Sequence, residues 1–129
     1  MKRTLATLLA LVLGANGLAM MFAGLAWYGA VPGVVTTGPY NPHFVKDIGA
    51  AYLVCASALA WRAWRPAAGQ GALVAAAVFL ILHALIHVAD AAVCGNPAGA
   101  LVRDFPGVFV PALITAWLAW PARSRLTPA

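Results

Sequence analysis

The chain has 129 residues, of which 64% are hydrophobic and only 9% are charged. Soluble domains are about 45–50% apolar and about 25% charged, so this composition excludes an ordinary globular protein. The net charge of +5 does not indicate a nucleic-acid partner, because the cations are grouped at the ends of apolar segments. We therefore expect a single domain, residues 1–129, embedded in a lipid bilayer.

Four apolar segments are long enough to cross a bilayer, which takes about 20 helical residues. They cover about residues 4–28, 43–64, 72–93 and 105–120. The first continues well beyond the ~7–15 apolar residues of a secretory signal, so we expect it to be retained. Glycine and proline residues separate the four segments and favour turns there. The sequence thus predicts an all-α fold, a four-helix bundle in the membrane.

Basic residues indicate how the chain is oriented in the membrane. Six of the eight cations fall on one side of the predicted membrane, namely Lys2, Arg3, Arg62, Arg65, Arg123 and Arg125. Loops that stay in the cytoplasm carry the excess of lysine and arginine. We therefore expect both termini in the cytoplasm and a multi-pass protein of the bacterial inner membrane, with the first and third connections on the periplasmic side.

Three ionisable residues interrupt the third apolar segment. His83, His87 and Asp90 follow one another at helical spacing, and at about 100° per residue they fall within about 60° of each other on one face. Ionisable groups inside a bilayer are costly and usually mark a functional site. The sequence therefore predicts a site on this face of the third segment.

Further polar residues are expected at the same outer side of the membrane. His43 and Asp47 stand four residues apart near the start of the second segment, where they would form an opposite wall. Lys46, Cys94 and Arg103 are candidates for contacts around such a site, with Arg103 orienting a carboxylate or an anionic ligand.

These residue types predict a transition-metal site. Two histidines four residues apart can bind one ion from one helix face, and imidazole with carboxylate suits copper, zinc or iron. We expect His83, His87 and Asp90 as ligands, and His43 and Asp47 as further ligands or as their support. The expected function is metal handling or membrane redox chemistry. The sequence names no reaction, so whether the protein is an enzyme stays open.

Three alternatives remain. Haem b usually needs two imidazoles that face each other from different helices, whereas His83 and His87 share a face, so haem ranks below a metal ion. The acids could instead pair with Lys46 or Arg103 in a purely structural network, within a homo-oligomer or as an accessory subunit of a larger membrane complex. A proton or small-solute site is the third, although polar residues do not continue beneath His83.

One short segment resembles a known family. The residues Lys46-Asp47-Ile48-Gly49 followed by Tyr52-Leu53 are similar to the entry of a helix in small four-span bacterial membrane proteins of the DoxX-like type. The resemblance implies a four-helix membrane architecture. Because those proteins are functionally diverse, it implies no activity and no ligand set for His83 and His87.

Overall fold

The computed structural model describes residues 1–120, and every regular element in that part of the chain is helical. The elements are α1 (Lys2–Phe22), α2 (Gly24–Ala30), η1 (Val34–Thr36), α3 (Pro42–Trp64), α4 (Gln70–Val93), α5 (Pro97–Asp104), the π-helical segment η2 (Phe105–Phe109) and α6 (Val110–Ala119). Four helices are long and apolar enough to cross a membrane, which confirms the predicted all-α class. Arg123 and Arg125, on which the predicted orientation partly depends, lie outside the described residues.

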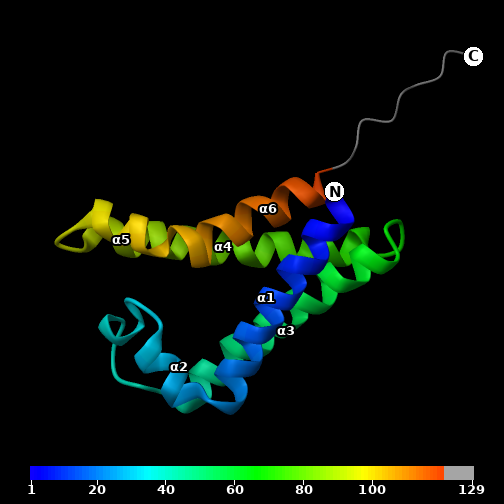
Figure 1. Ribbon diagram of the computed structural model, residues 1–129. Helices are drawn as coiled ribbons and strands as arrows, with labels where there is room; N and C mark the ends of the chain where they lie inside the picture. Colours follow the sequence, from blue (N-terminus) through cyan, green and yellow to red (C-terminus); the bar gives the residue numbers. More distant parts are fainter. Residues whose placement is uncertain (121–129) are drawn as a thin grey trace, which may run out of the picture.

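The membrane-length helices form two antiparallel pairs (Figure 1). In one pair α1 lies against α3, and in the other α4 lies against the continuous helix formed by α5, η2 and α6. The pairs meet at the end where α1 begins and α6 ends, and they diverge toward the opposite end. The segment that contains α2 and η1 lies at this open end.

The backbones of α1 and α3 touch at two glycines. A Cβ atom added to Gly17 would lie 2.8 Å from the carbonyl oxygen of Gly49, and one added to Gly49 would lie 3.1 Å from the carbonyl oxygen of Gly17. Small residues at such positions let membrane helices approach closely, and van der Waals packing then holds the pair together. This contact fixes which face of α3 points toward α1.

The two pairs are joined through α3 and α4. Their interface is made of fully buried small and branched side chains, among them Cys55, Leu59, Leu73 and Leu80. The thiol of Cys55 points at the carbonyl oxygen of Ala76, 4.0 Å away. The interface lies in the half of the molecule near the end where α1 begins and α6 ends, which we call the closed end. The other halves of the helices are therefore free to diverge.

The first helix ends earlier than the sequence suggests. Helix α1 stops at Phe22, because the backbone of Ala23 leaves helical geometry, and α2 continues in a new direction. The indole of Trp27 in α2 donates a hydrogen bond of 2.8 Å to the side-chain oxygen of Asn16 in α1. This bond holds α2 against the helix from which it departs.

The last membrane helix begins earlier than expected. It starts at Pro97, where the side chain of Asn96 accepts a hydrogen bond of 3.0 Å from the backbone N–H of Gly99. Pro106 and Pro111 lack an N–H group; Pro106 lies within the π-helical segment η2, and Pro111 lies in the first turn of α6. The helix therefore runs from Pro97 to Ala119 in place of the predicted start at 105.

Candidate functional site

The third membrane helix places two histidines side by side, as the sequence predicts. His83 and His87 are one turn apart on α4, and their ring centroids are 4.8 Å apart in an edge-to-face arrangement. Both side chains are partly buried, near the open end of the molecule. Each ring therefore has one side against protein and can present a nitrogen to a ligand.

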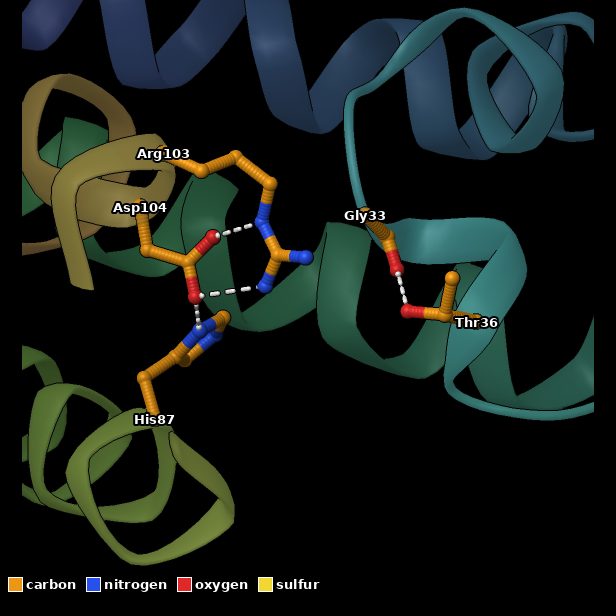
Figure 2. A network of polar contacts seen from close by, with 5 residues as sticks. All are labelled: Gly33, Thr36, His87, Arg103 and Asp104. Carbon is orange, nitrogen blue, oxygen red and sulfur yellow. Dashed lines mark hydrogen bonds and ion pairs between the residues drawn. The ribbon is translucent and has the colours of Figure 1, made fainter. Parts of the chain in front are cut away.

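An aspartate from the neighbouring helix holds the second of these rings (Figure 2). Oδ2 of Asp104 accepts a hydrogen bond of 2.7 Å from Nδ1 of His87, and the Asp104 side chain is only 8% exposed. Arg103 donates to the same carboxylate from Nε to Oδ1 at 2.6 Å and from its terminal nitrogen to Oδ2 at 3.1 Å. A two-point contact of this kind is among the stronger charged pairs in proteins. The carboxylate is thus fixed and oriented toward His87.

The early start of the last helix explains why Asp104 can reach His87. Seven helical steps from Pro97 carry Asp104 about 10 Å along the helix axis, level with the last turns of α4. The π-helical segment begins at the next residue, Phe105. Such segments are often found at functional sites, because they change the direction of the side chains around them.

Aromatic side chains close the site on its inner side. The ring of His83 is stacked on Phe79 at 6.1 Å and meets the edge of the buried Tyr52 from α3 at 5.8 Å. Beyond Phe79, α4 carries alanine, valine and leucine. The site is therefore bounded by apolar groups toward the middle of the molecule, which agrees with the apolar floor expected beneath His83.

A loop from the other helix pair packs against the guanidinium group of Arg103. Gly33 has a positive φ of 85°, and a Cβ atom at this position would overlap the guanidinium group of Arg103. The hydroxyl of Thr36 donates 2.6 Å to the carbonyl oxygen of Gly33 and keeps the turn closed (Figure 2). Only glycine adopts this geometry without strain and leaves room for the arginine.

His43 and Asp47, which the sequence predicts as the opposite wall of the site, do not lie at the site. His43 and Asp47 form an i,i+4 pair on α3, with 3.3 Å between Nε2 and Oδ2, but their side chains are 88% and 60% exposed. The next residues on this face, Ala50 and Val54, are exposed as well. The reason is the contact of Gly49 with α1, which turns the His43 face of α3 outward.

The remaining predicted residues are also exposed. Asp90, in the last turn of α4, and Lys46 and Cys94 all lie at the surface near the open end. Within residues 1–120, no group of three or more histidine, cysteine, aspartate or glutamate side chains could hold a metal ion. Of the five predicted ligands, the structure brings together His83 and His87.

Asp104 takes the place at His87 that the helical spacing predicts for Asp90. Because the fourth apolar segment is predicted to start at about residue 105, Asp104 falls in a connection rather than in a helix. The signal that identifies Asp104 is the Asn-Pro pair at 96–97, a common helix start, followed by a charged dipeptide several residues later.

No family model, curated protein or solved structure matches the chain. The similarity of residues 46–53 to DoxX-like proteins therefore stays a prediction. The candidate site has to be interpreted from its own chemistry.

Proposed function

We propose that the protein binds a transition-metal ion through His83 and His87, for metal handling or membrane redox chemistry. The observation that carries the proposal is the hydrogen bond from Nδ1 of His87 to Asp104. Histidines that ligate a metal almost always donate their other ring N–H to a carboxylate or carbonyl, which fixes the ring and makes the free nitrogen more basic. Nε2 of His87 is the nitrogen left free in this way.

The donor set favours copper, zinc or iron over magnesium or calcium, because both nitrogens are imidazole. Two protein ligands leave at least two positions of a four-coordinate ion open. Water, a substrate or a ligand from another molecule would fill them. An open coordination sphere suits an ion that is exchanged or that reacts more than one that only stabilises a fold.

The test is elemental analysis of protein purified without chelator and then supplied with one metal at a time. We expect close to one ion per chain for copper, zinc or iron, and loss of that ion in His87→Ala. The matched control is His43→Ala, which removes an exposed imidazole from the same end of the molecule. Equal metal content in the two variants, or a stable wild-type protein without bound metal, would contradict the proposal. A Soret band in the absorption spectrum would indicate haem.

We also propose an orientation and a location. The cations Lys2, Arg3, Arg62 and Arg65 lie at the closed end of the molecule, and the histidine site lies near the open end. The positive-inside rule supports a cytoplasmic closed end and a site that faces outward, in the inner membrane of a bacterial-type cell. Cysteine labelling from the outside checks this, because the exposed Cys94 would be reached first.

A second candidate function is favoured by one observation. Arg103 already engages both oxygens of the Asp104 carboxylate, so the charge is satisfied without an ion. The network would then be structural, within an accessory subunit of a larger membrane complex. In that case metal content stays low, His87→Ala lowers thermal stability without any metal effect, and mild solubilisation recovers the chain together with other subunits.

A further inference from the structure

A groove lies between α1 and α3, away from the histidine site. Its volume is about 480 Å³, within the range of ligand-binding pockets. The lining consists mostly of small and apolar side chains with two hydroxyls, and includes Thr7, Ala10, Ala56, Ser57, Ala60 and Trp64. In a membrane-spanning helix pair, this groove opens toward the lipid.

The length of the groove matches one leaflet of a bilayer. On α3 it extends from Leu53 to Trp64, and at 1.5 Å per residue this distance is about 16 Å. The hydrocarbon core of a bilayer is about 30 Å thick, so the groove covers about half of it. A single acyl chain from the adjacent leaflet is an occupant of this length and polarity.

Two cations flank the end of the groove. The guanidinium of Arg65 lies 4.8 Å from the ring centre of Trp64, which lines that end. Arg3 is one turn before Thr7, whose hydroxyl donates a hydrogen bond of 3.0 Å to the Arg3 carbonyl oxygen. Lys2 is directed elsewhere, because its ammonium lies 4.7 Å from the ring centre of Trp117 in α6.

Among residues 1–120, no acidic side chain lies beside these cations. The chain has three acidic residues, and Asp47, Asp90 and Asp104 all lie in the half of the molecule toward the open end. An anionic group at the groove end would therefore meet two arginines and an indole ring at the depth where tryptophan favours the membrane interface. Charge and shape thus point to the same kind of partner.

We propose that the groove between α1 and α3 binds an anionic phospholipid, with one acyl chain between the helices and the phosphate at Arg3 and Arg65. The proposal is independent of metal binding, since the groove shares no residue with the histidine site. The proposal also explains why residues 56 and 60 are alanines, because larger side chains at these positions would fill the groove.

The experiment titrates delipidated full-length protein in detergent with phosphatidylglycerol and with phosphatidylcholine that carry the same acyl chains, and measures bound lipid by native mass spectrometry. We expect the wild type to prefer phosphatidylglycerol. Arg65→Gln and Arg3→Gln should each weaken phosphatidylglycerol binding about fivefold, with a smaller effect on phosphatidylcholine, because its choline cation offsets the charge of the phosphate. Ala60→Leu should weaken both lipids about tenfold, because it displaces methylenes of the bound chain.

The matched control is a substitution that places a larger side chain in a different groove. A second groove of about 530 Å³ lies between α3 and α4, and Ala75 lines it. At its basic end Arg62 is engaged, since its Nε donates 3.0 Å to the side-chain oxygen of Gln70. Ala75→Leu should therefore leave phosphatidylglycerol binding unchanged, and a circular dichroism melt of each variant confirms that it folds.

Three outcomes would overturn the proposal. Equal binding of the two lipids by the wild type would remove the role of the arginines. Loss of binding in Ala75→Leu with retention in Ala60→Leu would move the lipid to the other groove. Competition by glycerophosphate as effective as that by the whole lipid would show a phosphate site without an acyl chain.

Discussion

The Oδ2 atom of Asp104 lies 2.7 Å from Nδ1 of His87, although seventeen residues and a helix reversal separate them in the chain. The contact joins α5 to α4, and Arg103 extends it to the loop at Gly33. Three segments of the chain are therefore linked through the side chains of Arg103 and Asp104. Each of these contacts can be removed separately by substitution.

Asp104→Asn should lower metal affinity about 10–100-fold, the usual cost of losing a carboxylate that orients a ligating histidine. Asparagine keeps the shape of the side chain but removes the negative charge that accepts the hydrogen bond from Nδ1 of His87. Competition with a coloured chelator measures the affinity. The control is Asp90→Asn, an exposed position near the same helix end, which should have a smaller effect. A larger loss in Asp90→Asn would identify Asp90 as the partner of the site.

Arg103→Gln and Asp104→Asn should show coupled effects on stability. Residues in direct contact typically show interaction free energies of about 0.5–3 kcal/mol in a double-mutant cycle. Arg103→Gln alone leaves a carboxylate that is 8% exposed with one partner fewer. Unfolding in mixed detergent micelles is followed by tryptophan fluorescence. It gives the free energy of unfolding of the wild type, of each single variant and of the double variant. Additive effects would show that the two-point contact contributes nothing measurable.

Gly33→Ala should displace the loop from Arg103. A side chain at a left-handed position costs about 1–2 kcal/mol, and here its Cβ would also overlap the guanidinium group. Gly38 is a matched control, because it also has a positive φ, of 135°, but a Cβ atom there would have no neighbour within 4 Å. Hydrogen exchange at residues 31–37 should rise more in Gly33→Ala than in Gly38→Ala. The opposite order would exclude contact with Arg103 as the reason for the glycine.

Gly17→Ala should separate α1 from α3. Its Cβ would lie 2.8 Å from a backbone carbonyl oxygen that cannot move away without shifting the helix. Overpacking of this kind costs about 1–3 kcal/mol. Gly14→Ala, one turn earlier, would place its Cβ at an ordinary 3.6 Å from Ala56 and should be neutral or stabilising. Thermal unfolding in one detergent compares the two, and equal midpoints would contradict the close contact.

The four helices that are long and apolar enough to cross a membrane could be predicted, because length and hydropathy identify them. The start of the last one could not, since residues 97–104 include a glycine and two charges and have the composition of a loop. What makes them helical is the cap at Asn96 and the burial of Asp104 against α4, both of which depend on neighbours in space. The end of α1 at Ala23 could not be predicted either, because alanine is a residue that favours helices.

The shared face of His83 and His87 could be predicted because helical periodicity fixes it within one segment. The identity of the residues opposite them could not, because it depends on how each helix is rotated about its own axis. For α3 the rotation is set by the glycine contact with α1, and the same contact turns His43 and Asp47 to the outside. Two short motifs on separate helices therefore carry no information about whether they meet.

The short connection between α3 and α4 fixes the two helix pairs to each other at one end. It spans five residues, and the backbone N–H of Gly69 donates 2.8 Å to the carbonyl oxygen of Arg65, so the helix ends are held close. Helix α4 is about 36 Å long, and a change of about 5° in the angle between the pairs moves its far end by about 3 Å. A displacement of this size equals the length of a hydrogen bond, so it is large enough to break a contact at the far end of α4. The separation of Gly33 from Arg103 would change with the angle between the pairs, and a spin or fluorophore pair placed there would measure that angle.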